Sequence, residues 1–313
     1  MTLVIVCCLL VPSCSINKMA MKAVSNALTA RGSPDVFTAD SDPQLVGDAL
    51  PFAIKMHESL LQANPEHQGL LRATGSLFVM YANAFVQRPA EQLPRSMYAE
   101  RQAAMERAKK MYLRGLELLY RGLGLKPPAF SGAFGKSALA ETLAGMKRED
   151  VPSLYWGAVA GVSAFSLNPL DLNLGLRLQE FLALAERAYE LDAGFNSGAL
   201  DDFFLLFYAS VPESMGGDKD RAETHYRRAL EKSGGLLASP YVSYAQALSI
   251  PAQDYDTFKT CLEAALSIDP DAAPSSRLVN TILQRKARYL LDNAALYFID
   301  TGTDGWDWDD SDW

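Results

Sequence analysis

The chain has 313 residues, 49% of them hydrophobic and 21% charged, which is enough to bury one large core or one continuous array of repeats. The formal net charge is −8, but six aspartates lie within the last fourteen residues, and without them 31 acidic residues face 29 basic ones. A body this close to neutral gives no electrostatic reason to expect nucleic acid as a partner. Three of the four cysteines lie in the first fourteen residues, so a disulfide framework is excluded as well.

Residues 1–13 are predicted to be a signal peptide that ends at a lipid-modified cysteine. Residues 2–11 are almost wholly apolar, too few to span a bilayer but typical of a signal-peptide core. Ser13 then precedes Cys14 as in a bacterial lipobox, and cleavage there would expose Cys14 for acylation and membrane anchoring. No Lys or Arg precedes the apolar run. The alternatives are an upstream start, an atypical signal, or a buried first element of a cytosolic protein.

From there to residue 293 the sequence predicts a single all-α domain, with no sustained period-two alternation. In chain order, the first expected helices cover residues 16–29, 43–62, 66–87 and 97–120. Residues 124–137, rich in Pro and Gly, are expected to form the longest loop. Residues 294–313 are predicted to be a disordered acidic tail, in which residues 300–313 alternate aspartates with tryptophans.

The second half of this domain carries a repeat pattern. Ala222, Tyr226 and Ala229 have the small–large–small spacing of the second helix of a tetratricopeptide repeat. The break at Gly234-Gly235 lies about 35 residues before Pro270, close to the repeat length of 34. The remainder of the repeat consensus is missing. We therefore expect degenerate tetratricopeptide-like hairpins in a compact solenoid or bundle, with an irregular helical bundle as the alternative.

No motif indicates catalysis, a metal or a cofactor. The Gly-Lys-Ser at residues 135–137 resembles the end of a phosphate-binding loop, but Phe130 stands where that motif needs a glycine. The three histidines lack metal-ligand spacing, and we expect them to be solvated or to cap helices. Asp201-Asp202 lies at the start of an apolar helix, where negative charge is favourable without any catalytic role. The sequence predicts a protein that is not an enzyme.

Aromatic residues in the second half are candidates for a ligand cleft or pore. They lie near small residues that let helices approach, and aromatic side chains can line an apolar cleft. Ordinary packing between repeats is the alternative interpretation. The candidates are Tyr155, Trp156, Phe203, Phe204, Phe207, Tyr208, Tyr241 and Tyr244.

Four stretches in order along the chain resemble a known family. They are residues 40–61 (beginning Asp-Ser-Asp-Pro-Gln-Leu-Val-Gly), 154–160 (Leu-Tyr-Trp-Gly-Ala-Val-Ala), 210–222 (beginning Ser-Val-Pro-Glu-Ser-Met-Gly-Gly-Asp) and 277–291 (beginning Arg-Leu-Val-Asn). In these stretches the chain resembles the tetratricopeptide-repeat proteins associated with TRAP transporters, the T components.

The resemblance implies a periplasmic lipoprotein of helical repeats, held at a membrane only by its lipid anchor. It also implies a homotrimer that partners the extracytoplasmic substrate-binding P component. Each protomer would have a pore or cleft able to hold or pass a small ligand, either apolar or an organic acid, and no catalytic residue. The alternative function is a tetratricopeptide adaptor of the cell envelope that grips peptides.

Overall fold

Helix boundaries follow the turn-forming residues of the sequence. Helix α2 (Pro43–Ala63) begins directly after Asp42, whose carboxylate accepts hydrogen bonds from the backbone N–H groups of Gln44 and Leu45 at 2.9 and 3.2 Å. Such a cap satisfies donors that the first turn of a helix leaves free. The helix ends at Asn64-Pro65, within a residue or two of the predicted end.

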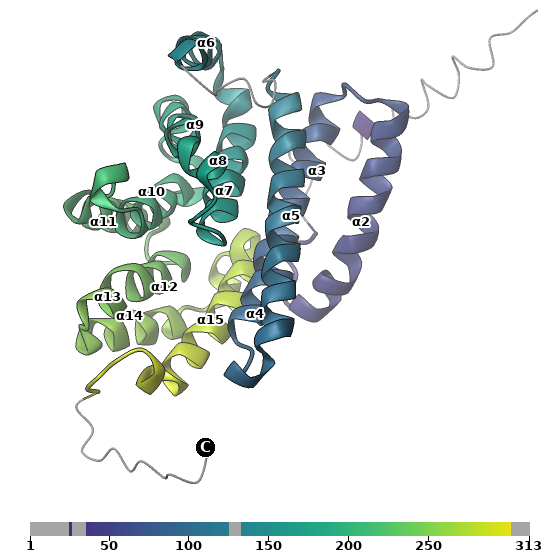
Figure 1. The fold of residues 1–313 in the computed structure, drawn as a ribbon. Coiled ribbons are helices and arrows are strands. Elements are labelled where there is room, and N and C mark those ends of the chain that lie inside the picture. The colour runs from purple at the N-terminus through teal and green to yellow at the C-terminus, as the bar shows by residue number, and fades with distance from the viewer. Residues whose placement is uncertain (1–24, 27–35, 125–132, 302–313) are drawn as a thin grey trace, which may run out of the picture.

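The computed structural model describes residues 25–26, 36–124 and 133–301 (Figure 1). The predicted signal peptide, Cys14 and the last twelve residues lie outside these ranges. Within them the chain is helical and has no strand, which confirms the all-α prediction. After α2, the helices are α3 (Gln68–Tyr81), α4 (Arg88–Glu91), α5 (Tyr98–Gly122), α6 (Ala133–Ala144), α7 (Val151–Ser166), α8 (Leu172–Leu176), α9 (Leu178–Leu191), α10 (Ala199–Ser210), α11 (Lys219–Ser233), α12 (Ser239–Tyr244), α13 (Ile250–Ala252), α14 (Tyr255–Ser267) and α15 (Arg277–Asp292).

Two predicted boundaries differ from the structure. Helix α6 begins at Ala133, inside the predicted loop 124–137, because the glycine at 135 is accommodated within a helix. At the other end, Phe298 is 3% exposed and packs on Phe258, with ring centroids 4.8 Å apart. Ala294 and Phe298, which the sequence assigned to the acidic tail, are therefore buried in the folded domain, whereas Leu296 between them is 56% exposed.

The helices pack one after another and the last returns to the first, as Figure 1 shows. The backbone N–H of Leu278, in α15, donates to the carbonyl of Thr38 at 3.0 Å, and the Arg277 guanidinium donates to the carbonyl of Ala39 at 2.7 Å. Lys286 of α15 forms an ion pair with Glu91 of α4 at 2.9 Å. Unlike an open solenoid, the array thus closes on itself, and its buried hydrophobic residues form three clusters.

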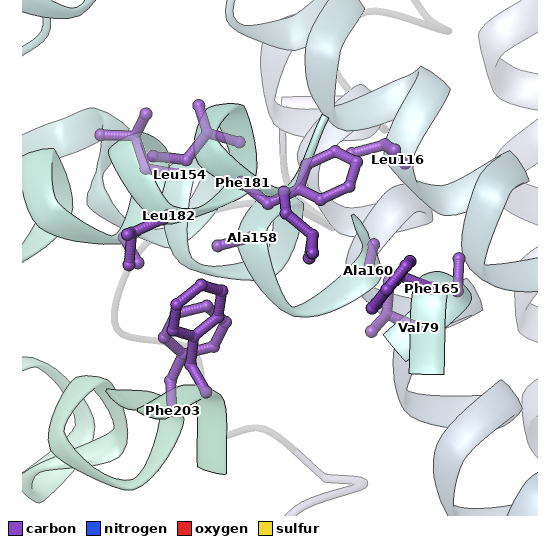
Figure 2. Close-up of a cluster of buried hydrophobic side chains, with 14 of the residues drawn as sticks. Val79, Leu116, Leu154, Ala158, Ala160, Phe165, Phe181, Leu182 and Phe203 are labelled. Atoms are coloured by element: carbon purple, nitrogen blue, oxygen red, sulfur yellow. The ribbon is translucent and has the colours of Figure 1, made fainter. Parts of the chain in front are cut away.

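Close helix crossings build the largest core cluster, which runs from α3 to α11 (Figure 2). Gly161 of α7 lies under the ring of Phe181 from α9, where an added Cβ would stand 2.3 Å from a ring carbon. Gly75 and Gly115 bring α3 and α5 together in the same way. Burying a phenylalanine side chain stabilises the fold by about 1.5–3 kcal/mol, so these crossings hold the framework around the interior rigid.

Helix α11 carries the predicted repeat pattern. Ala222 and Ala229 are 0% and 1% exposed, and Tyr226 packs on Tyr244 of α12 with ring centroids 4.4 Å apart. Asp218 caps the helix by accepting from the backbone N–H of Arg221 at 3.0 Å. The small–large–small spacing therefore does mediate packing between neighbouring helices, and the tetratricopeptide assignment itself stays a prediction.

Candidate functional site

Two helices contain a π-helical turn, at Ala82–Gln87 and Ala245–Ser249. In both, the backbone N–H that follows the segment bonds to the carbonyl five residues earlier: Arg88 to Asn83, and Ile250 to Ala245. Similar sequences open the two segments, Tyr-Ala-Asn-Ala at residues 81–84 and Tyr-Ala-Gln-Ala at residues 244–247. π-Helical turns occur frequently at functional sites, so these segments direct attention to the side chains around them.

A proline explains why each helix widens. Pro89 and Pro251 each stand two residues after a π-helical segment. Proline has no backbone N–H, and its ring crowds the carbonyl four residues earlier in an α-helix. A wider turn moves that carbonyl away, so the helix continues with a shifted register. The shift turns the residues beside Pro89, Arg88 above all, toward directions that a regular α-helix would not give them.

Arg88 lies at the centre of a set of polar side chains from α4, α5 and α15. Its Nε donates to the Asn83 side chain at 2.9 Å, and the described residues offer it no ion pair. Burial lowers its pKa, and the charges of Glu91 and Asp202, with the Tyr112 hydroxyl, only partly offset this effect. The Arg88 guanidinium is therefore desolvated by the surrounding protein but forms no ion pair with a carboxylate of the described residues.

Neighbouring polar groups are fully engaged with each other. Gln87 donates to Glu91 at 2.7 Å and accepts from the Tyr112 hydroxyl at 2.6 Å. Glu91 also binds Lys286, which lies only 11% exposed. These contacts hold the side chains on one side of Arg88 in place. They also pair Glu91 with Lys286, so that Glu91 forms no ion pair with Arg88.

Asp202 reaches the same set from α10. Burial raises its pKa, and the hydroxyls of Ser243 and Ser239 with the charge of Arg88 offset only part of that rise. Its Oδ1 is inaccessible to solvent and has no hydrogen-bond partner among the described residues. The Asp202 charge also contributes, after burial, to raising the pKa of Tyr155 on α7. Four helices distant in sequence thus meet around one carboxylate.

Arg88, Tyr155 and Asp202 keep partial solvent exposure, although desolvation is the largest influence on the pKa of each. The polar set around Arg88 thus brings together one cation, one anion and hydroxyl groups in a half-buried environment. The described residues contain no cluster that could hold a metal ion.

The eight aromatic residues predicted to line a cleft fall into two groups. Four of them are core residues that expose 7% of their surface or less: Phe203, Phe204, Phe207 and Tyr208. Four keep partial exposure: Tyr155, Trp156, Tyr241 and Tyr244. Among these, Tyr155 packs against Trp156 and Phe195, whereas Tyr241 and Tyr244 pack against Tyr226. A lining role for the eight stays a prediction.

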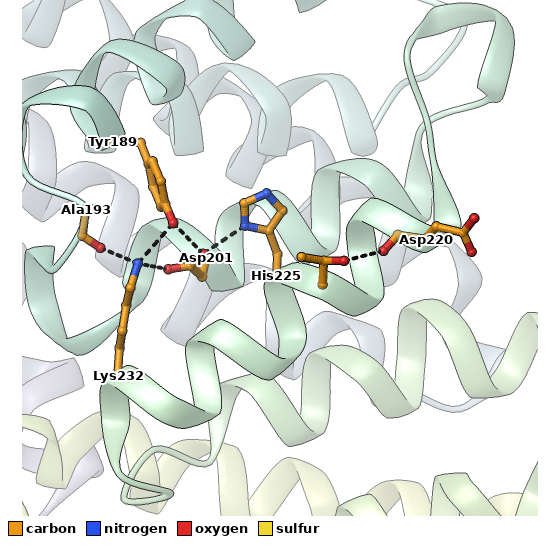
Figure 3. A network of polar contacts seen from close by, with 7 residues as sticks. Tyr189, Ala193, Asp201, Asp220, His225 and Lys232 are labelled. Atoms are coloured by element: carbon orange, nitrogen blue, oxygen red, sulfur yellow. Dashed lines mark hydrogen bonds and ion pairs between the residues drawn. The ribbon is translucent and has the colours of Figure 1, made fainter.

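Asp201, next to Asp202, forms a separate buried network that ties α10 to α9 and α11 (Figure 3). It accepts from Lys232 at 2.6 Å and from Tyr189 at 3.2 Å, and it pairs with Nδ1 of His225 at 2.8 Å. Burial would raise the Asp201 pKa, but the His225 and Lys232 contacts outweigh it and hold the pKa below its ordinary value. Every contact is used for packing, and the arrangement is structural.

The expectation for His225 was wrong. It is 8% exposed rather than solvated, because its ring packs between Phe204 and Tyr208 at centroid distances of 4.8 and 5.8 Å. His67 does cap a helix, since its Nδ1 accepts from the backbone N–H of Leu70 at 3.1 Å.

Comparison with known proteins gives the family. Residues 39–298 match the TRAP transporter T-component family. The chain belongs to this family. It is also 34% identical over 310 residues to a protein of Treponema pallidum (strain Nichols) described as uncharacterized, an alignment that covers 94% of this chain and 95% of that protein.

Membership makes the protein an accessory component of a TRAP transport system, and the family is not one of enzymes. In this T component, no helix of the described ranges is long and apolar enough to cross a membrane. The sequence interpretation missed Arg88, Asp202 and Lys286 as site residues. The signals that were available are the two Tyr-Ala-x-Ala segments, each followed by a proline, and a lone arginine beside the first of them.

Proposed function

We propose that this T component holds or passes a small ligand, apolar or an organic acid, for the extracytoplasmic P component of its TRAP system. The proposal is supported by membership of the T-component family together with the polar set around Arg88, in which Arg88 uses only its Nε and Asp202 Oδ1 has no hydrogen-bond partner among the described residues. A structural role alone does not account for such groups, because leaving charges buried and unpaired costs stability.

Delivery to a partner needs the protein at a membrane surface outside the cytoplasm. We propose that cleavage before Cys14 and acylation of that residue provide the anchor, and that the protein acts as a periplasmic homotrimer. One acyl chain anchors a protein only marginally, so diacylation of the thiol with acylation of the amine is the arrangement that would retain it.

The partnership is tested by expressing the T component with the P component encoded beside it and purifying each through a tag on the other. We expect the two to co-purify from the membrane fraction, and light scattering to give the mass of a trimer for the T component alone. Recovery of the T component without the P component, at low and at moderate salt, would remove the basis of the proposal.

The anchor is tested by replacing Cys14 with Ser. Radiolabelled palmitate should mark the wild-type protein and leave Cys14→Ser unlabelled, and the variant should leave the membrane fraction. Cys261→Ser is the matched control, because that thiol is 5% exposed within the core. Equal labelling of wild type and Cys14→Ser would disprove acylation at Cys14.

An adaptor function is the second candidate, favoured by an exposed apolar segment around α8. Leu170, Leu172 and Leu176 are 89%, 80% and 83% exposed, unusual values for three neighbouring leucines on one surface. An adaptor would bind peptides on this segment and lose them in the triple Leu→Ser variant, with no ligand effect at Arg88. A peptide-display screen on immobilised protein separates the two candidates.

A further inference from the structure

Helix α2 presents an apolar stripe that no part of the described chain covers. The helix lies at the edge of the array and packs mainly on α3 (Figure 1). Leu45, Phe52 and Met56 expose 58%, 74% and 37% of their surface, and Ala49 between them is exposed as well. Their spacing of +4, +3 and +4 places all four on one face, as in the seam of a coiled coil. Single exposed apolar residues are ordinary on a protein surface, whereas a continuous stripe marks an interaction surface.

The order of large and small residues along this stripe favours a second copy of α2 that runs in the opposite direction. In that arrangement Ala49 of each copy faces Phe52 of the other, and Leu45 faces Met56. A small residue opposite a large one gives the interdigitated layers of a well-packed interface. A parallel copy would instead place the two Phe52 rings against each other and leave a gap between the two Ala49 side chains.

The charges beside the stripe favour the same orientation. Asp48 and Lys55 lie seven residues apart along one border of the stripe, at the positions that flank an apolar seam and set the direction of pairing. In an antiparallel pair, Asp48 of each copy comes next to Lys55 of the other. A parallel pair would place Asp48 beside Ala53, which is buried within its own copy, and would pair no charges.

Both charged side chains can reach a second copy without breaking the fold. The Lys55 side chain is 68% exposed and binds Glu58 at 2.8 Å, but Glu58 also binds Arg114. Asp48 is exposed and accepts from the side-chain amide of Gln44 at 3.2 Å. Both the Lys55–Glu58 and the Gln44–Asp48 contact lie on the surface of α2 itself. Exchanging them for contacts with another copy therefore leaves the packing of α2 on α3 unchanged.

We propose that α2 is a two-fold docking surface for a second copy of this chain, paired antiparallel through the four residues of the stripe. A two-fold contact uses the same patch on both copies, so it cannot provide the contacts of a trimer. The inference therefore goes beyond the proposed function and predicts an even number of copies, either a dimer or a hexamer in which two trimers meet.

The length of the stripe sets the expected strength of this contact. From Leu45 to Met56 the stripe covers about three helical turns, or ~17 Å, so it buries less surface than a standard stable interface. We therefore expect weak association in solution. The proposed acylation at Cys14 would confine the copies to one membrane surface and raise their effective concentration, which favours a contact of this kind.

Analytical ultracentrifugation of the mature chain in detergent follows the mass of the assembly with concentration. We expect dimers or hexamers to form between about 10 µM and about 1 mM, the range of a weak interface. Phe52→Ser should raise the concentration of half-association at least about tenfold. The melting temperature should not change, because the Phe52 side chain is largely exposed. Ile299→Ser, at an apolar residue that is 82% exposed, is the control and should associate like wild type.

Exchange of charges tests the direction of pairing. Asp48→Lys brings two lysines together at each end of the seam, and Lys55→Asp brings two aspartates together, so each should weaken association about fivefold at low salt. The double variant Asp48→Lys/Lys55→Asp again places opposite charges side by side and should associate like wild type. Lys259→Glu, at an exposed lysine of α14, is the control and should have no effect.

A mass of one or three copies at the highest concentration would overturn the inference, and so would dimers or hexamers that persist in Phe52→Ser. Failure of the double charge variant to recover association would exclude the antiparallel pairing and overturn the inference as well. Co-purification with the P component is measured on the same variants. If Phe52→Ser loses the P component while wild type has one or three copies, the α2 stripe binds that partner and the inference is wrong. Lost co-purification of wild type removes the proposed function instead, whatever its mass.

Discussion

Asp201 and Asp202 are neighbours in the sequence and opposites in environment. Asp201 is completely buried and bound by Lys232, His225 and Tyr189, and its pKa is lowered. Asp202, about 100° further around α10, has one oxygen without a hydrogen-bond partner among the described residues and a raised pKa. An aspartate therefore stabilises the fold at position 201 and destabilises it at position 202. The same substitution at each position can serve as the control for the other.

Replacing each aspartate with asparagine should move stability in different directions. Asp201→Asn removes charge-assisted hydrogen bonds and leaves Lys232 unpaired, so we expect a loss of about 2–3 kcal/mol in the free energy of unfolding. Asp202→Asn removes a desolvated charge and should leave the melting temperature unchanged or higher. Calorimetry of both variants in one buffer tests this, and a large loss for Asp202→Asn would show that Asp202 has a structural partner.

The contributions of the Asp201 and Asp202 carboxyl groups to stability should also depend on pH with opposite signs. A lowered folded-state pKa, as at Asp201, contributes stability that is present above the ordinary value of 3.8 and is lost as pH falls through the lower folded value. A raised folded-state pKa, as at Asp202, contributes stability that is present below pH 3.8 and is lost as pH rises through that higher folded-state pKa. Melting curves should show both variants differing from wild type most at pH 7. Any gain of Asp202→Asn should shrink as pH falls toward 3.8, whereas the deficit of Asp201→Asn should shrink only below 3.8, as pH approaches the lower folded-state pKa of Asp201. Differences that stay constant with pH would contradict the charge argument.

The helices could be predicted from the sequence, but the polar set around Arg88 could not. Asp42-Pro43 and Asn64-Pro65 mark helix ends by local chemistry, which needs no knowledge of the fold. The meeting of Arg88 with Asp202 depends on packing between segments more than a hundred residues apart, which no periodicity encodes. Helical spacing also cannot distinguish an α-helical from a π-helical turn, so the register shift ahead of Pro89 was invisible. The Asp201-Asp202 pair was assigned to helix dipole chemistry because both were treated alike.

Removing Pro89 should change the register of its helix without unfolding the protein. Pro89→Ala restores a backbone N–H that can bond to the carbonyl four residues earlier, favouring a regular α-helix over the π-helical turn at Ala82–Gln87. Arg88 would then change direction and lose its hydrogen bond to Asn83, and we expect a loss of about 0.5–1.5 kcal/mol in the free energy of unfolding. Pro152→Ala, in the first turn of α7 where proline fits a regular helix, is the control. A midpoint of urea unfolding equal to that of wild type in Pro89→Ala would show that Pro89 does not hold the π-helical turn in place.

The close crossing of α7 and α9 predicts a strong asymmetry between two glycines on one helix. A Cβ at Gly161 would stand 2.3–2.5 Å from three ring carbons of Phe181, which is buried and cannot withdraw. Overpacking of this kind costs about 1–3 kcal/mol, more than the gain of up to about 1 kcal/mol that alanine brings to a helix. At Gly157 the nearest atom, on Leu184, is 3.4 Å away, an ordinary contact. We therefore expect Gly161→Ala to lower the midpoint of urea unfolding and Gly157→Ala to leave it unchanged or raise it. Equal unfolding midpoints for the two variants would mean that α7 and α9 separate more easily than their packing indicates.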